Sequence, residues 1–267
     1  MKKLFYVLKI VLCILVPTSH AHAAARLDII KTIDEIEDIL PTIAPHIACG
    51  PCTLVAFDID ETLIWASDPR ARSEWFNQEF TRYKGLGLSP HDALKQFFVK
   101  HLQAHNDSLF YPVDKDTNLV FELLKQQNIH IIGLTARQPL MNSITTKQFA
   151  GAHIAFPNPI PRWNDTFVFA GPEQPVLAID GIIYSSGQDK GKTLGLFIDA
   201  LSYRPQLLVM VDDMLYNVQN VQQFAVSRNI PFIGFHLNKY EKSIRPLLEE
   251  GVMPTHVALS AGSIPVK

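Results

Sequence analysis

The chain has 267 residues, of which 47% are hydrophobic and 19% are charged, and its formal net charge is −2. This length and composition suffice for one globular domain with a large core, and they leave room for an insertion. A chain without an excess of lysine and arginine lacks the charge that binding to nucleic acid or to an anionic membrane surface requires, so we expect neither as a partner.

The first 23 residues have the features of a secretory signal peptide. A positively charged start precedes a nearly uninterrupted apolar segment over residues 4–16, and Ala21-His22-Ala23 has the small-x-small pattern of a cleavage site. The apolar segment is short for a membrane span of about 20 residues, so we favour cleavage over an uncleaved anchor. We therefore expect an exported protein, periplasmic or secreted from a bacterium, with no membrane segment after cleavage.

Two cysteines remain in the mature chain, in the sequence Cys49-Gly50-Pro51-Cys52. The same spelling occurs in thioredoxin active sites, where a helix N-terminus lowers the pKa of the first thiol. Here an apolar strand, expected over residues 53–57, follows the motif in place of a helix. In an oxidising compartment we favour a local disulfide over free thiols or redox activity.

Residues 26–40 predict an amphipathic helix that stops at Pro41, because apolar residues recur there at helical spacing. Two more helices are expected within residues 66–111, near 70–84 and 90–104, the second with Ser89 as its N-cap. Further helices are expected near 115–127, 139–150, 191–202 and 214–228, and strands at 129–134, 167–169, 176–184, 207–211 and 231–235. Short apolar strands that alternate with helices are typical of an α/β fold with a central parallel sheet.

Polar residues follow three of the predicted strands, and ligands of parallel sheets bind at the carboxyl ends of strands. Carboxylates crowded at one edge repel one another unless a cation offsets them, which predicts a hard divalent ion, magnesium above all. An aspartate neutralised in this way can attack phosphorus, and a second aspartate can move the proton. The residues concerned are Asp58, Asp60, Thr135, Asp212 and Asp213, with Lys190 and Lys192 at the start of the helix before the third strand.

Four segments, in this order, resemble the motifs of the haloacid dehalogenase (HAD) superfamily: Asp58-Ile59-Asp60-Glu61-Thr62, Leu134-Thr135-Ala136-Arg137, Lys190-Gly191 and Val211-Asp212-Asp213. The first is also similar to the start of the exported acid phosphatases of that superfamily. The resemblance implies a Rossmann-like three-layer fold and a magnesium-dependent phosphomonoester hydrolase that forms an aspartyl-phosphate.

The resemblance also implies a role for each matched residue. Asp58 would be the nucleophile and a ligand of Mg²⁺, and Asp60 the general acid/base, with its backbone carbonyl on the metal. Thr135 would hold the phosphoryl group, unless it only caps the following turn. Lys190 would balance the charge on Asp58 and on the phosphate. Lys192 competes for this role, but the glycine after Lys190 favours Lys190.

Two further aspartates complete the implied magnesium site. Asp212 would be the third protein ligand, and Asp213 would bind through water or lie just outside the ligand set. Asp213 is equally well placed as the N-cap of the helix near 214–228, and the two roles can coexist.

We assign no chemical role to several neighbouring residues. Arg137 is expected to be a solvated surface residue, although it could reach phosphate. His101 and His105 lie four apart on a predicted helix, a spacing compatible with zinc, but without a third ligand we expect both on a solvated surface. Asn217 and His236 are expected near the edge of the site.

After the signal peptide over 1–23, the resemblance implies a catalytic core over 24–65 and 112–267 and a small helical cap over 66–111, inserted after the first motif. The irregular segment 158–163 would overhang the site or brace the neighbouring hairpin. A compact cap is compatible with a phosphorylated small molecule or a phosphorylated macromolecule as substrate.

Phosphomonoester hydrolysis is the leading prediction. A dehalogenase is disfavoured because those relatives lack an acid/base aspartate at the position of Asp60 and need no metal, and a phosphomutase is disfavoured outside the cytoplasm. The alternative from another class is a catalytically silent exported binding or effector protein that retains the fold.

Overall fold

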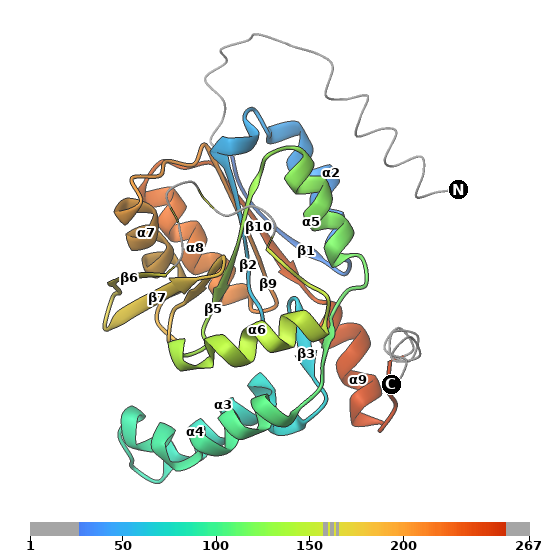
Figure 1. Cartoon of the computed structure of the whole chain (residues 1–267), viewed down its shortest axis with the longest axis vertical. Helices are drawn as coiled ribbons and strands as arrows, with labels where there is room; N and C mark the ends of the chain where they lie inside the picture. Colours follow the sequence, from blue (N-terminus) through green and yellow to red (C-terminus); the bar gives the residue numbers. More distant parts are fainter. Residues whose placement is uncertain (1–26, 157–159, 161–162, 164–165, 255–267) are drawn as a thin grey trace.

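The structure is a computed structural model that describes residues 27–156, 160, 163 and 166–254, so the predicted signal peptide and most of segment 158–163 lie outside the described residues. An eight-stranded sheet forms the centre, in the order β1-β10-β9-β2-β5-β8-β7-β6 (Figure 1). The first six strands of this order run parallel, and β7 and β6 are antiparallel additions. The strands are β1 (Asp28–Ile33), β2 (Thr53–Phe57), β5 (His130–Thr135), β6 (Phe167–Ala170), β7 (Pro175–Ile179), β8 (Ile182–Tyr184), β9 (Leu207–Asp212) and β10 (Phe232–Leu237).

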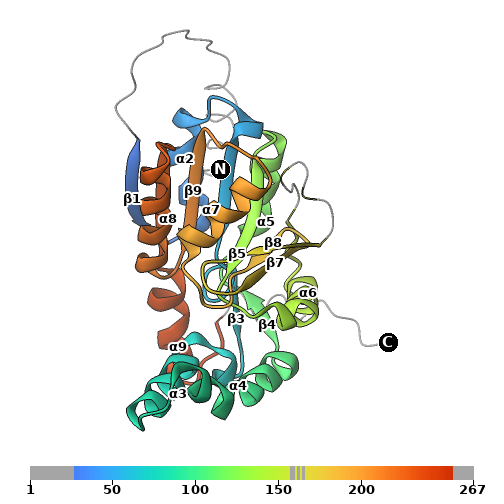
Figure 2. The same cartoon turned by 90° about the vertical axis from the view of Figure 1, so that its left-hand side faces the viewer.

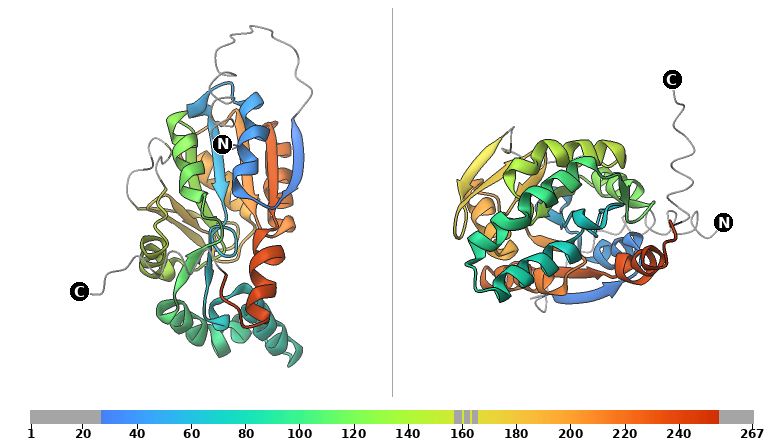
Figure 3. Two further views of the ribbon diagram at one scale, coloured as in Figure 1. Left: turned by 90° about the vertical axis from the view of Figure 1, so that its right-hand side faces the viewer. Right: turned by 90° about the horizontal axis from the view of Figure 1, so that it is seen from below.

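Helices cover both faces of the sheet (Figures 2 and 3). α7 (Lys190–Ala200) and α8 (Leu215–Ser227) lie on one face, and α2 (Ile39–Ile43) and α5 (Thr117–Gln126) lie on the other. Successive side chains of a strand point to opposite faces. Leu54 and Ala56 of β2 accordingly pack with α7 and α8, whereas Val55 and Phe57 pack with α2 and α5. The predicted Rossmann-like three-layer α/β fold is confirmed.

A helical insertion leaves the core between two short paired strands. β3 (Ile64–Ala66) pairs antiparallel with β4 (Phe110–Pro112). The chain between them forms the 3-10 turn η4 (Pro69–Ala71) and the helices α3 (Ser73–Gly85) and α4 (Pro90–Asp107). As predicted, Ser89 caps α4, because its Oγ accepts the N–H of Asp92 at 3.2 Å. This helix pair lies beyond the carboxyl ends of the central strands, outside the three layers (Figure 1).

The remaining helices lie near the same end of the sheet (Figure 1). The 3-10 turn η5 (Pro139–Met141) and helix α6 (Asn142–Gly151) follow β5. A π-helical turn, η6 (Tyr240–Ile244), continues into α9 (Arg245–Glu249). Tyr240 and Ile244 pack against Trp65 and Val113 at the base of the insertion. No helix within the described ranges is long and apolar enough to cross a membrane.

The predicted helix over 26–40 is wrong. Residues 28–33 form β1, which pairs in parallel with β10, and the chain then turns through η1 (Ile36–Asp38) into α2, which contains Pro41. The apolar spacing fits a helix, but four β-branched residues lie in the segment, at Ile29, Ile30, Thr32 and Ile33. In addition, the open edge of β10 offers hydrogen bonds that the local pattern does not reveal.

The other predicted elements are confirmed to within a few residues. The segment 176–184 is not one strand but the hairpin of β7 and β8. Its turn is made by Asp180 and Gly181, with φ angles of 52° and 80°. Positive φ at both central residues is the conformation that two-residue hairpins favour, and Asp-Gly is a preferred sequence for it.

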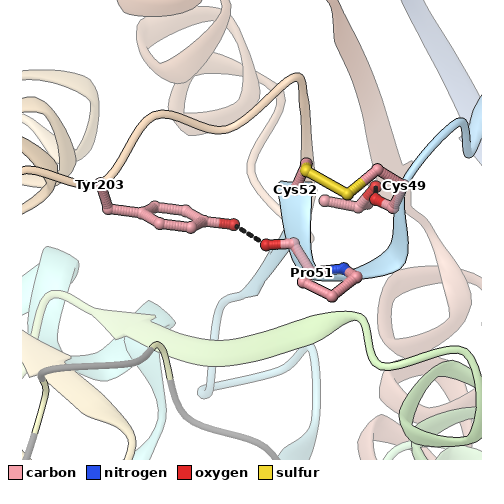
Figure 4. Close-up of a disulfide and its surroundings, with 5 residues drawn as sticks. Cys49, Pro51, Cys52 and Tyr203 are labelled. Carbon is pink, nitrogen blue, oxygen red and sulfur yellow. Dashed lines mark hydrogen bonds between the residues drawn. A yellow bond between two sulfur atoms is a disulfide. The ribbon is translucent and has the colours of Figure 1, made fainter.

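A disulfide joins Cys49 and Cys52 at the amino end of β2, which confirms the favoured interpretation of the motif (Figure 4). The hydroxyl of Tyr203 donates to the carbonyl of Pro51 at 3.1 Å. A Cβ on Gly50 would lie 1.7 Å from the carbonyl oxygen of Gln127, so this position has room only for glycine. The disulfide-bonded turn therefore fixes the amino end of β2, the central strand whose carboxyl end leads to Asp58.

We expect the replacement of both cysteines, Cys49→Ser with Cys52→Ser, to lower the free energy of unfolding by about 2 kcal/mol. Without the disulfide the unfolded chain is no longer closed into a four-residue loop, so its conformational entropy is higher. Urea denaturation with and without dithiothreitol would measure this. Reductant should weaken the wild type to the level of the double variant and leave the variant unchanged. Equal stability of wild type and variant without reductant would contradict the prediction.

Candidate active site

Three strands and one helix bring charged and hydroxyl side chains to the carboxyl edge of the sheet. Asp58 follows β2 directly, Thr135 ends β5 and Asp212 ends β9, while Lys190 begins α7. The backbone N–H of Asp58 donates to the carbonyl of Val211 at 2.9 Å, so β9 also fixes this aspartate. All four side chains are buried. The edge that the sequence predicted as a site therefore collects these residues.

Lys190 lies between two of the carboxylates. Its ammonium donates to Oδ1 of Asp58 and, at 2.7 Å, to Oδ2 of Asp212. Lys192 is exposed, and its backbone N–H donates to Asp189, the N-cap residue of α7. Lys190 is thus the lysine that faces Asp58, in agreement with the preference stated from the sequence.

Three buried carboxylates crowd around this single ammonium. Ligand oxygens of Asp58, Asp212 and Asp213 all lie within 4.8 Å of one another. Burial raises the pKa of Asp58 to about 7, with Lys190 opposing and Asp212 and Asp60 adding to the shift. Burial also raises the pKa of Asp213 well above its usual range, helped by the charge of Asp212. A cluster of oxygen donors with excess negative charge has the chemistry that suits a hard divalent cation.

Thr62 and Asn217 form hydrogen bonds to Asp213 and Asp212, respectively. The hydroxyl of Thr62 lies 3.2 Å from Oδ1 of Asp213 and 3.4 Å from Oδ2 of Asp58, and its oxygen accepts the N–H of Asp213. Oδ1 of Asp212 accepts the N–H of Met214 at 2.8 Å and the side-chain N–H of Asn217 at 3.0 Å. The carboxylate that serves the start of α8 is therefore Asp212, and the prediction of Asp213 as its N-cap is wrong.

Asp60 is held by an arginine that the sequence analysis placed on the surface. Nε and Nη2 of Arg137 donate to the two carboxylate oxygens of Asp60 at 2.9 and 2.7 Å. Arg137 is only 5% exposed, so the expectation of a solvated side chain is wrong. Burial alone would raise the pKa of Asp60, but the charge and hydrogen bonds of Arg137 outweigh it and lower the pKa to about 2. The sequence signal was its place two residues after Thr135, in the turn that leaves β5.

Thr135 is fully buried, and its Oγ1 accepts the backbone N–H of Arg137 at 3.2 Å. This is the turn-capping role that a threonine after a strand often has. Thr135 therefore shapes the turn that carries Arg137.

His101 and His105 are buried, so their predicted place on a solvated surface is wrong. Their rings lie 4.5 Å apart on α4, and both electrostatically influence Asp60. Nδ1 of His101 lies 2.8 Å from the carbonyl of Arg70, and Gln148 donates to the carbonyl of His105 at 2.8 Å. Burial lowers the pKa of His101, and it lowers that of His105 well below its usual range. The histidines thus line the insertion where it meets the site.

Glu61 was missed by the sequence analysis and connects the first motif to the insertion. It is a buried residue with a φ of 62°, a left-handed conformation that is unusual for a glutamate. Its carboxylate accepts the N–H of Ser73 at 2.8 Å, in the first turn of α3. Burial, with the nearby charge of Glu74, raises the pKa of Glu61 to about 8.

We expect His105 to lower the stability of the protein as the pH drops below about 6.5, the pKa of histidine in an unfolded chain. The buried carboxyls of Asp58, Glu61 and Asp213, whose pKa values are raised, act in the opposite direction, so the effect of His105 is measured as a difference between variants. The folded-state pKa of His105 is depressed, so its stabilising effect is present above that pH and is lost as the pH falls. A histidine that stays neutral contributes a slope of about 1.4 kcal/mol per pH unit. Urea unfolding from about pH 7.5 to about pH 5 measures it.

His105→Asn should remove this contribution, so that between about pH 7.5 and about pH 5 the stability of the variant falls less, or rises more, than that of the wild type. His91→Asn, at an exposed histidine of the same helix, should leave the pH dependence as in the wild type. An unchanged slope in His105→Asn would contradict the assignment to His105.

Comparisons with known proteins give one family match and several distant relatives. The family described as "Protein of unknown function (DUF2608)" matches residues 32–252. A "Putative outer membrane protein" of Chlamydia muridarum is 22% identical, over 80% of this chain and 77% of the relative. A protein with the same description from Chlamydia trachomatis serovar D is also 22% identical, over 84% and 82%.

Two solved structures are similar at low scores. The "Putative Phosphatase from Clostridium difficile" has 13% identity and a TM-score of 0.38, over 70% of this chain and 96% of that chain. The "putative beta-phosphoglucomutase from Thermotoga maritima" has 11% identity and a TM-score of 0.39, over 74% and 99%. The fold described above rests on the sheet order and the layers themselves. With its match over most of its length, the chain belongs to the family described as "Protein of unknown function (DUF2608)".

Proposed function

We propose that this protein is an exported, magnesium-dependent phosphomonoester hydrolase of HAD type that acts through an aspartyl-phosphate. The observation that carries the proposal is the convergence of Asp58, Asp212 and Asp213 at the carboxyl edge of the sheet, with Lys190 paired to the first two. The order of the motifs along the chain supports it independently. The outer membrane description of the Chlamydia relatives supports export.

Asp58, Asp212 and Asp213, with the backbone carbonyl of Asp60, would hold the magnesium ion. When bound, the ion would offset the repulsion among these carboxylates and attract a phosphoryl oxygen. Burial first, and then the charge of neighbouring carboxylates, raises the pKa values of Asp58 and Asp213 despite the presence of Lys190. This supports the assignment, because a bound cation would favour the ionised form of both groups.

The chain's own residues divide the reaction into two steps. A carboxylate oxygen of Asp58 attacks phosphorus, the ester bond breaks, and Asp60 gives a proton to the leaving oxygen. Asp60 then takes a proton from water, which attacks the aspartyl-phosphate and releases phosphate. Lys190 and the hydroxyl of Thr135 would bind the phosphoryl oxygens. Arg137 keeps Asp60 ionised before the substrate binds. The proton that Asp60 passes to the leaving oxygen would therefore come from the substrate, since the monoanion of a phosphate ester carries one proton on its phosphate group.

The insertion would act as the cap of this site. Residues 66–111 would form the cap, and residues 24–65 and 112–267 the catalytic core. The position of α3 and α4 beyond the strand ends supports this division (Figure 1), as does the bond of Glu61 to the start of α3. The substrate would be a phosphorylated small molecule or a phosphorylated macromolecule.

One observation favours the alternative, a catalytically silent exported binding or effector protein. Both carboxylate oxygens of Asp60 are already bound by Arg137, so the proposed acid/base is occupied at rest. An activity assay separates the two functions.

We expect purified residues 24–267 to release phosphate from p-nitrophenyl phosphate with magnesium and to lose this activity in EDTA. Asp58→Asn should reduce turnover to background because it removes the nucleophile, and Asp60→Asn should cost about 10²–10⁴-fold. The matched control is Asp180→Asn, the same change in the exposed β7–β8 turn, which should keep full activity. Activity unchanged in Asp58→Asn would exclude the covalent route.

Magnesium should also raise the melting temperature of the wild type, since a ligand of the folded state stabilises it. Asp213→Asn should lose part of this shift. In EDTA the same variant should be more stable than the wild type, because it removes a buried carboxylate whose ionised form is disfavoured. Thermal unfolding in EDTA and in magnesium measures both effects. A variant that is less stable in EDTA and keeps the full shift would argue against Asp213 as a metal residue.

A further inference from the structure

Arg137 is buried and almost fully used in hydrogen bonds. Nε and Nη2 donate to the two oxygens of Asp60, and Nη1 donates to Oγ1 of Thr145 at 2.8 Å and to Oε1 of Gln148 at 2.6 Å. Four of its five N–H groups are thereby directed at protein atoms. The ring of Phe110 lies under the guanidinium, 5.7 Å from its carbon. Little of this side chain is left to bind a substrate phosphate.

The partners of Arg137 on α6 are themselves fixed. The hydroxyl of Thr145 donates to the carbonyl of Met141 at 2.9 Å, so its oxygen turns a lone pair toward Arg137. The amide nitrogen of Gln148 donates to the carbonyl of His105 at 2.8 Å. Arginine only donates and a carbonyl only accepts, so both contacts require the same orientation of the Gln148 amide. The guanidinium is therefore held in one place by α6 and, through His105, by α4.

A bidentate pair with a fixed guanidinium leaves the carboxylate of Asp60 one orientation. Asp60 is the more exposed partner, with 25% of its side chain accessible against 3% for Arg137. The buried arginine therefore forms the rigid side of the pair, and the carboxylate that it orients keeps part of its surface accessible.

We propose that Arg137 is a positioning residue that fixes the carboxylate of Asp60 for proton transfer to the leaving group, with Thr145 and Gln148 setting the place of the guanidinium. This inference rests on the proposed phosphatase function. A shift of about 1 Å in a reacting group can cost about 10²-fold in rate, so a loosened Asp60 would protonate poor leaving groups badly. A good leaving group needs no proton and would not respond.

The test compares kcat/KM for p-nitrophenyl phosphate, phenyl phosphate and an alkyl phosphate, because kcat/KM reports the step in which the ester bond breaks. Arg137→Lys should lower the value about 10²-fold for the alkyl ester and only about 3-fold or less for the p-nitrophenyl ester. Gln148→Met, which leaves the Arg137–Asp60 pair in place, should act in the same direction and more weakly, and it serves if Arg137→Lys does not fold. Arg204→Lys, at an exposed arginine, is the matched control.

Inhibition by inorganic phosphate separates positioning from phosphate binding. Its inhibition constant should stay within about 3-fold of the wild type in Arg137→Lys, since the arginine has few donors to offer an anion. A large rise in that constant, an equal loss for all three esters, or a gain in activity would each overturn the positioning role while leaving the phosphatase function intact. A wild type that hydrolyses none of the esters would overturn the proposed function, and the positioning role with it.

Discussion

The buried ion pairs of Lys190 with Asp58 and Asp212 are the constraint on which the rest of the site depends. Burying three carboxylates costs free energy unless positive charge accompanies them. One ammonium at the first residue of α7 supplies part of that charge, and the excess of negative charge is what makes the cluster receptive to a cation. The parallel sheet makes the arrangement possible, because β2 and β9 are neighbours and end at the same edge.

The second constraint is the contact between core and insertion. Glu61 joins the loop after β2 to α3, and Gln148 joins α6 to α4, so the insertion is tied to the site from two sides. Each of these contacts satisfies a buried polar group that would otherwise destabilise the fold. The insertion therefore shares hydrogen bonds with residues next to Asp60 and with the partners of Arg137.

The fold class and the polar residues at the strand ends could be predicted from the sequence, because both follow from local rules. Short apolar runs form strands, and the ligands of parallel sheets bind at the carboxyl ends of those strands. Sequence patterns failed where the deciding partner lies far along the chain. Nothing local shows that Arg137 would meet Asp60, or that α4 would turn His105 inward onto α6. The β1 segment failed for the same reason, because its alternative to a helix is a ladder with the last strand of the sheet.

That ladder has a consequence for how the chain is assembled. Asp28 of β1 pairs with Phe232 of β10, 204 residues later, so the first strand to leave the ribosome waits for the last strand before it gains a neighbour. Contacts at such separations form slowly, since the intervening chain must be ordered first. Until β10 arrives, a β-branched segment with unpaired backbone groups is open to other chains, which makes this edge the one that a chaperone would have to shield.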